Sequence, residues 1–150
     1  MNKTHNNIPK GNAVYGSKAA KAIIDSLITG LENKDGIVRV KAHQQLVAYK
    51  KRPVAHLIKT LSDENDWVRW EAAKALSQIG NPESIQALLE ALADKQFEVR
   101  WLAAEGLIRI GHKAMVPLLG ALVKHSDLYW LREGIHHVLH DINRGKVSKV

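Results

Sequence analysis

The sequence predicts an all-α protein, an α-solenoid of about four stacked helical hairpins. Two interleaved patterns support this prediction, because each recurs four times at a step of 30 to 32 residues. In the first, an apolar pair is followed three residues later by Leu, at Leu27-Ile28/Leu31, Leu57-Ile58/Leu61, Leu88-Leu89/Leu92 and Leu118-Leu119/Leu122. In the second, an aliphatic residue precedes Arg, at Val38-Arg39, Val68-Arg69, Val99-Arg100 and Leu131-Arg132. Hairpins with such apolar faces bury them by stacking on their neighbours.

Each repeat is expected to hold two helices. In chain order the expected pairs are 17–32 with 36–50, 53–62 with 66–79, 83–93 with 97–110, and 113–124 with 127–143. Apolar residues recur at helical spacing within them, as Val68, Ala72, Leu76 and Ile79 do. Residues 1–16 are polar and rich in Asn, so we expect a flexible N-terminal tail there and a basic C-terminal tail over 144–150.

Turn residues fall where these helices should begin and end. Asp35, Asn65 and Ser126 precede second helices and are expected to be N-caps. Gly80 and Gly111 follow the last periodic residue of a second helix, where a left-handed C-terminal cap is favoured. Asn81-Pro82 then restarts the chain, with Pro at the start of the next helix.

The composition is that of a soluble globular protein. Of 150 residues, 45% are hydrophobic and 25% charged, and the mean hydropathy is −0.22. We find no apolar run near the roughly 20 residues of a membrane span and no signal-peptide core, so we expect a cytoplasmic protein with no membrane partner. Cys is absent, which excludes disulfides, thiolate metal sites and a Cys nucleophile.

The net charge of +7 lies entirely at the two ends of the chain. Residues 1–21 carry four Lys and residues 144–150 carry three basic residues, in both cases without an acid. Residues 22–143 therefore hold 15 basic and 15 acidic residues. This balance argues against a long basic groove, so nucleic acid is not the expected partner.

Two central stretches carry a family resemblance, SDENDWVRWEAAKALSQIGNPESIQALLEAL and ADKQFEVRWLAAEGLIRIGHKAMVPLLGAL. They resemble the short HEAT-like repeats of the bilin (phycocyanobilin) lyase type, in which Asp precedes a Val-Arg pair, followed by Ala-Ala, Ala-Leu and Ile-Gly. The resemblance covers about residues 17–143. Asp63 lies six residues before Arg69, and Asp94 lies six residues before Arg100. The resemblance implies that Asp and Arg residues at these positions pair between neighbouring repeats. The end repeats depart from the pattern, because Asn33 and Ser126 replace the Asp.

Large aromatic residues gather in the first turns of the expected second helices, off the apolar stripe. They are Trp67, Trp70, Phe97, Trp101, Tyr129 and Trp130. The resemblance implies that second helices line the concave face, where such side chains form an interface hot spot. The alternative is that these rings fill gaps between repeats.

Charged residues of both signs share this expected face. They include Lys41, Lys74, Glu71, Glu98, Glu105 and Arg109. Mixed charge around aromatic rings favours a protein or peptide partner over a phosphate backbone. The predicted partner-binding set is therefore the six aromatic residues together with Glu71 and Glu105.

Catalytic and metal-binding motifs are not found. The sequence has no Gly-rich phosphate loop and no nucleophile elbow, so we assign no catalytic residue and no cofactor. His136, His137 and His140 lie in the last helix, and the first and third share a helix face. The sequence leaves open whether they bind a metal, and we assign no metal site.

The leading hypothesis is a non-enzymatic interaction module or scaffold that binds a protein or peptide on its concave face. The resemblance leaves a bilin lyase-like or phycobilisome-associated HEAT-like protein as an alternative. A lesser alternative is a HEAT-like DNA-binding protein, for which Trp67 with Asp66 and Arg109 give a faint parallel. The last helix has no following repeat to cover it yet contains Ile135, Val138, Leu139 and Ile142. This leaves three alternatives: a short tail caps the helix, the chain is truncated, or the helix self-associates.

Overall fold

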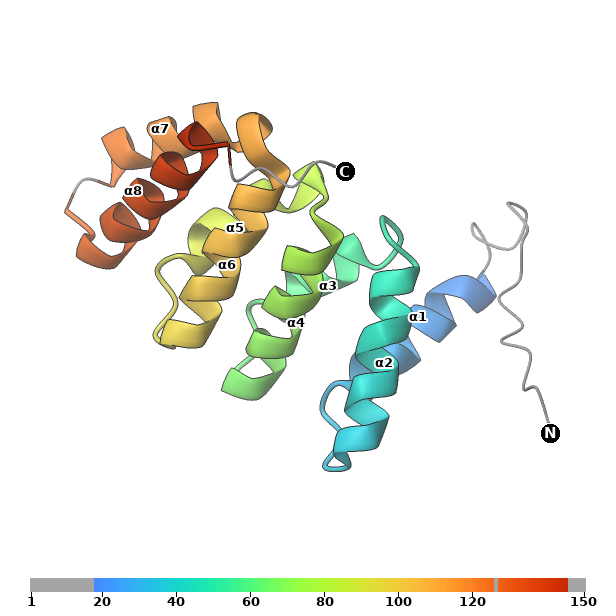
Figure 1. Ribbon diagram of the computed structural model, residues 1–150. Coiled ribbons are helices and arrows are strands. Elements are labelled where there is room, and N and C mark those ends of the chain that lie inside the picture. Colours follow the sequence, from blue (N-terminus) through green and yellow to red (C-terminus); the bar gives the residue numbers. More distant parts are fainter. Residues whose placement is uncertain (1–17, 126, 146–150) are drawn as a thin grey trace.

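The computed structural model describes residues 18–125 and 127–145, which contain helices and turns and no strand. The helices pair in chain order into four hairpins that stack side by side (Figure 1), which confirms the predicted all-α solenoid. They are α1 (Lys18–Gly30), α2 (Gly36–Ala48), α3 (Val54–Thr60), α4 (Asp66–Ile79), α5 (Ile85–Ala91), α6 (Phe97–Ile110), α7 (Met115–Lys124) and α8 (Tyr129–Asn143), with 3-10 turns η1 (Pro82–Ser84) and η2 (Gly111–Ala114). Residues 1–16 and most of 144–150, the expected tails, lie outside the described residues.

The hairpins form two layers, with α1, α3, α5 and α7 in one and α2, α4, α6 and α8 in the other (Figure 1). The second helices contact one another more extensively than the first helices do, and the contact between α4 and α6 is the largest. Closer packing on one side of a stack makes that side the inner one. The second helices therefore line the concave face.

The leucine ladder forms the core between the layers. Leu31, Leu57, Leu88 and Leu118 are completely buried, one from each repeat. Residues of the second helices meet them from the other layer, among them Leu46, Leu76, Leu107 and Ile135, which are equally buried. Burying each such side chain contributes about 1.5–3 kcal/mol, so the regular repeat in the sequence becomes one continuous core.

Two of the predicted N-caps are present. The side chain of Asp35 accepts a hydrogen bond from the Ile37 amide at 2.8 Å, and that of Asn65 accepts one from the Trp67 amide at 3.0 Å. The prediction for Ser126 falls outside the described residues, and α8 begins after Leu128 with no side-chain cap. The two capped helices are the ones that form the first groove described below.

The two glycines at helix ends behave differently. Gly80 has φ 63° and ψ 32°, the predicted left-handed cap, and Pro82 opens η1 behind the Asn81 cap. Gly111 also has a positive φ, 72°, but its ψ of −139° lies outside the left-handed helical region. The predicted cap is therefore wrong at Gly111, because the chain enters η2 directly there instead of passing through an Asn-Pro linker.

The arginine ladder fastens α2, α4 and α6 to the loops that precede them. In three repeats the guanidinium donates to two backbone carbonyls of that loop, over distances of 2.7–3.2 Å. The donor and acceptors are Arg39 with Asn33 and Lys34, Arg69 with Asp63 and Glu64, and Arg100 with Asp94 and Lys95. The planar fork of Arg suits this double contact.

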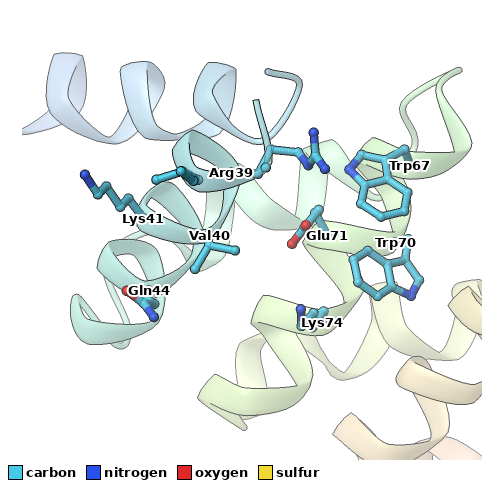
Figure 2. A pocket seen from close by; sticks show the side chains of 10 residues that line it. Arg39, Val40, Lys41, Gln44, Trp67, Trp70, Glu71 and Lys74 are labelled. Carbon is cyan, nitrogen blue, oxygen red and sulfur yellow. The ribbon is translucent and has the colours of Figure 1, made fainter. Parts of the chain in front are cut away.

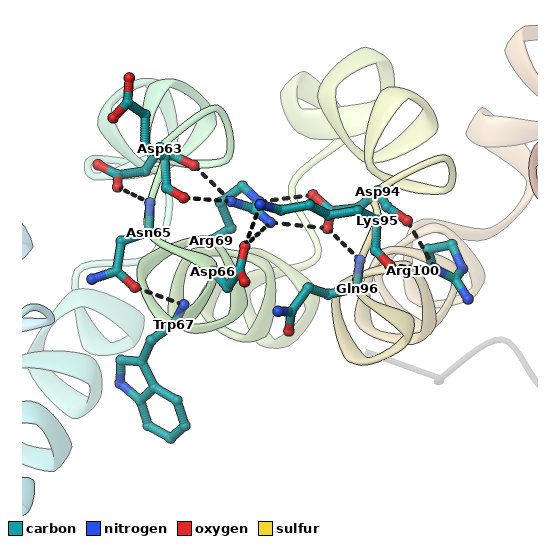
Figure 3. A network of polar contacts seen from close by, with 10 residues as sticks. Asp63, Asn65, Asp66, Trp67, Arg69, Asp94, Lys95, Gln96 and Arg100 are labelled. Atoms are coloured by element: carbon teal, nitrogen blue, oxygen red, sulfur yellow. Dashed lines mark hydrogen bonds and ion pairs between the residues drawn. The ribbon is translucent and has the colours of Figure 1, made fainter.

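Arg69 also joins two repeats, as Figure 3 shows. Its Nε lies 2.8 Å from Asp94 Oδ2, which confirms the pairing between repeats that the resemblance implies. Asp66 accepts from Arg69 at 2.6 Å and from Lys95 Nζ at 2.9 Å, and these bonds hold the pKa of Asp66 below its ordinary value. The hydrogen bond that Arg69 donates to Asp94 raises the pKa of Arg69.

The neighbouring arginines contact rings in place of carboxylates. Arg39 lies 5.1 Å from the ring centroid of Trp67, and Arg100 lies 4.5 Å from that of Trp130. Both rings belong to the next repeat along the chain. The link between repeats therefore alternates between a cation–π contact and an ion pair.

The apolar stripe of the last helix is buried. Ile135, Val138 and Ile142 are at most 2% exposed, because α8 packs against α6 and α7. No following repeat is therefore needed to bury these three residues. Exposed apolar side chains at this end of the stack include Val116, Leu119 and Val123 of α7.

One stretch, Phe97–Lys124, is long and apolar enough by composition to cross a membrane, with a mean hydropathy of 1.3, and the sequence reading did not single it out. In the structure it is divided at Gly111 into α6 and η2–α7. Helix α6 packs against α4 of the preceding repeat, and α7 packs against α5 of the preceding repeat and α8 of its own. A third of the most apolar window of Phe97–Lys124 is buried inside the solenoid, and Val116, Leu119 and Val123 of the same stretch are exposed.

Candidate functional site

The predicted aromatic residues all lie at the start of a second helix, on the concave layer. Trp67 and Trp70 belong to α4, Phe97 and Trp101 to α6, and Tyr129 and Trp130 to α8. Five of them are between 45% and 63% exposed, whereas Trp70 is half-buried and packs against the core. The rings are therefore not enclosed between repeats, although Trp70 also has a packing role.

A first groove of about 570 Å³ runs between α2 and α4 (Figure 2). Its apolar walls are Ile37 and Val40 of α2 and Trp67 and Trp70 of α4. The remaining lining consists of Gly36 and the polar side chains of Arg39, Lys41, Gln44, Glu71 and Lys74. In Figure 2, Val40 and Glu71 point into the space between the two helices.

A second groove of about 420 Å³ lies between α4 and α6. It is lined by Trp70, Lys74, Ser77, Gln78, Phe97, Glu98, Trp101 and Leu102. Trp70 and Lys74 line both grooves and so form the ridge that separates them. The two grooves follow one another along the concave face.

The ridge is held by contacts among its own side chains. The Lys74 ammonium lies 4.6 Å from the Trp70 ring centroid, and the rings of Trp67 and Trp70 are 4.7 Å apart at a tilt of 32°. Cation–π and tilted aromatic contacts of this kind each contribute about 0.5–1.5 kcal/mol. The ridge is thus largely organised before any ligand arrives.

Tyr129 and Trp130 lie beyond the two grooves, at the start of α8. Their rings meet edge to face at 5.1 Å, and the Arg100 guanidinium lies 4.5 Å from the Trp130 centroid. Neither residue lines the first or the second groove. The structure therefore brings four of the six predicted aromatic residues together in the grooves and leaves this pair at their end.

The two predicted acidic residues have different places. Glu71 is 4% exposed at the base of the first groove, with its Oε2 3.1 Å from His43 Nδ1. The other ring nitrogen of His43 lies 3.1 Å from Gln78 Oε1, so α2 and α4 meet through a buried polar contact. Glu105 is half-buried one turn beyond Trp101 and lines neither groove, whereas Glu98 lines the second.

Sequence reasoning missed the contribution of α2. Ile37 and Val40 are 66% and 54% exposed and occupy, relative to the Val-Arg pair, the positions of Trp67 and Trp70. An alignment of the first two repeats on the Val-Arg pair would have predicted this contribution, because the residues on either side of the pair are apolar in both of these repeats. The positions of the tryptophans alone do not reveal this surface, because Ile37 and Val40 are aliphatic.

The histidines of α8 do not gather with acids into a metal-binding group. His136 and His137 are exposed, and His140 Nδ1 lies 3.2 Å from Asp141 Oδ1. Within the part of the chain that the structure describes, no group of three or more His, Asp or Glu residues is placed to hold a metal ion.

Comparisons with known proteins identify the repeat. The chain is similar to a crystal structure of an engineered protein, a Northeast Structural Genomics Consortium target, with a TM-score of 0.50 and 24% identity over 85% of this chain and 64% of that one. The chain thus spans less than two thirds of that protein's length, and the likeness concerns the fold alone. No curated protein matches the chain. Residues 24–103, more than half of the chain, match the model of HEAT repeats, and the chain belongs to this family.

Proposed function

We propose that the protein is a non-enzymatic interaction module that binds a protein or peptide on the concave face formed by α2, α4, α6 and α8. The observation that carries the proposal is the row of exposed aromatic side chains beside two neighbouring grooves. HEAT repeats form extended surfaces of this kind, which supports a role as a scaffold.

The energetic argument concerns the cost of leaving large rings in water. Trp101 and Phe97 are at least half exposed, whereas Val99 and Ala103 of the same helix are completely buried. Aromatic side chains bury more apolar area on binding than other residues and dominate interface energetics. Contiguous exposed rings next to a groove are therefore typical of a binding surface.

The charges along the face support a protein ligand over a nucleic acid. Lys74 lies between the grooves, and Glu98 lines the second groove opposite it. A phosphate backbone that followed the face would meet this carboxylate, whereas a polypeptide can present either sign.

The test is selection of a displayed random peptide library on the full chain, with counter-selection on the Trp70→Ala/Trp101→Ala double variant. We expect enriched peptides that bind the unmodified protein and not the variant, provided that circular dichroism shows equal helix content. Peptides that bind both proteins equally contradict the proposal, because binding would then lie elsewhere on the molecule.

The bilin lyase-like alternative remains a second candidate, supported by the resemblance of the two central repeats to that repeat type. It predicts a shift in bilin absorbance when phycocyanobilin is mixed with the protein. An unchanged bilin spectrum contradicts this alternative and leaves the peptide-binding proposal as it stands.

A further inference from the structure

We infer that the first groove takes a polypeptide segment in which an apolar side chain is flanked by acidic residues. This inference rests on the proposed function and adds the chemistry of the ligand. It follows from the combination, in one groove, of apolar walls and an excess of cations whose charges are not neutralised by neighbouring carboxylates.

Three cations line the groove, Arg39, Lys41 and Lys74. Among the described residues none of them forms an ion pair with Asp or Glu: Arg39 donates to backbone carbonyls, and Lys74 lies over Trp70. Lys41 lines the groove and is exposed on α2, with its ammonium drawn pointing away from Trp67 and Trp70 in Figure 2. Among the described residues no carboxylate therefore neutralises any of the three charges.

The one carboxylate in the lining, that of Glu71, is buried and so does little to neutralise the three cations where a ligand would meet them. Glu71 is 4% exposed, and its Oε2 lies 3.1 Å from His43 Nδ1. Even with the charge of Glu71 counted in full, three cations against one anion leave the groove positive. A ligand carboxylate near Lys41 and Lys74 therefore gains attraction that a neutral ligand does not.

The walls between the cations suit an apolar side chain. Ile37 and Val40 stand on one side and Trp67 and Trp70 on the other, and the groove volume of about 570 Å³ leaves room for an aliphatic or aromatic anchor. Arg39 is fixed at one end by carbonyls of its own loop and by the Trp67 ring. Such a site is organised in advance, which lowers the entropic cost of binding.

Nucleic acid is the competing polyanion, and the adjoining surface disfavours it. The second groove continues the face and carries Glu98, with Glu105 farther along α6. A short acidic segment in the first groove avoids these carboxylates, whereas a long phosphate backbone does not.

The experiment measures fluorescence anisotropy of labelled peptides with the full chain. The peptides share leucine and phenylalanine positions and differ in the flanking residues, which are glutamate, glutamine or lysine. We expect the glutamate peptide to bind tightest. Lys41→Glu and Lys74→Glu should each weaken it by about three- to tenfold at low salt, and added salt should reduce the difference.

Lys59→Glu is the matched control, because Lys59 is exposed on α3 in the other layer and undergoes the same charge change. It should leave peptide binding unchanged. Equal binding of the three peptides, or equal effects of the Lys41 and Lys59 substitutions, overturns the inference. Tighter binding of a single-stranded oligonucleotide of matched charge, with the same dependence on Lys41, also overturns it in favour of nucleic acid.

Trp70→Ala separates failure of this inference from failure of the proposed function. If all three peptides bind equally and all lose affinity in Trp70→Ala, the face binds peptides but does not select acidic ones. If none of the peptides binds, the acidic-apolar ligand is contradicted, and the library selection decides on the proposed function independently.

Discussion

Arg69 differs from the arginines of the other repeats' aliphatic-Arg pairs in its burial and in its partners. It is 6% exposed and bonds to Asp94, Asp66 and two loop carbonyls, whereas Arg100 is half-buried and combines two carbonyls with a ring contact. Loss of a buried charged residue leaves its partners without compensation, which costs more than loss of an exposed one.

Arg69→Ala is therefore expected to lower the free energy of unfolding by about 3 kcal/mol and Arg100→Ala by about 1 kcal/mol. Urea denaturation followed by circular dichroism measures both. Peptide binding by the folded variants should change little, because neither side chain lines a groove. Equal melting of Arg69→Ala and the unmodified protein contradicts a structural role for the ladder.

Asp66 gives the molecule an acid-sensitive contact. Hydrogen bonds from Lys95 and Arg69 lower its pKa in the folded state, so the unfolded state binds the proton more readily. The stabilisation is complete above the ordinary Asp pKa of about 4 and is lost as the pH falls through the lower folded value. The urea midpoint of Asp66→Asn should lie below that of the unmodified protein at neutral pH and converge with it in acid. A pH-independent gap contradicts this.

The family resemblance predicted part of this network and not the rest. The resemblance implied the ion pair of Arg69 with Asp94, and the structure contains it. Asp63 stands at the equivalent position after Arg39, yet the Arg39 guanidinium lies over Trp67. Sequence spacing fixes which residues come near one another but not which of two suitable partners a long side chain selects.

At the scale of elements, the helices follow closely from the sequence because several local signals agree. The leucine ladder sets the buried face, Asp35 and Asn65 supply caps, and Gly80 ends α4 with a positive φ. The missed feature, the turn at Gly111, depends on ψ, which glycine leaves free. The burial of α8 was missed because helical periodicity shows an apolar stripe without showing which neighbours cover it.

Two helical glycines test how closely the elements pack. A Cβ at Gly106 would lie 2.9 Å from Leu88 Cδ1 and 3.2 Å from the Ser77 backbone, whereas a Cβ at Gly120 meets nothing within 4 Å. Gly106→Ala should therefore destabilise the protein by about 1–3 kcal/mol through overpacking between α4 and α6. Gly120→Ala should stabilise it by about 0.5–1 kcal/mol, because Ala favours helix.

Gly120→Ala is the control for Gly106→Ala, because both variants replace a helical glycine by alanine. Thermal and urea unfolding of both proteins give the comparison. Stabilisation by both substitutions would show that α4 and α6 are not in close contact at Ser77.

At the scale of the whole molecule, the concave aromatic face was predictable and its grooves were not. The repeat register places Trp67, Trp70, Phe97 and Trp101 on one layer of helices. The width of each groove depends on how far neighbouring second helices stand apart, and α2 and α4 are less extensively in contact than α4 and α6. That spacing reflects contacts between repeats, such as His43 with Glu71, which no local pattern encodes.

The central claim is that the concave face binds a polypeptide, and Trp101→Ala tests it most directly. Trp101 is half exposed, whereas Trp70 also packs against the core, so a Trp70 substitution would affect stability as well as binding. The measurement is the Kd of a peptide selected on the unmodified protein, with Val123→Ala on the exposed side of α7 as the control. The account predicts a loss of at least about 30-fold in affinity, equivalent to about 2 kcal/mol, for Trp101→Ala with the helix content unchanged. It predicts no change for Val123→Ala. Equal Kd values for Trp101→Ala and the unmodified protein, or loss of binding in Val123→Ala alone, would contradict it.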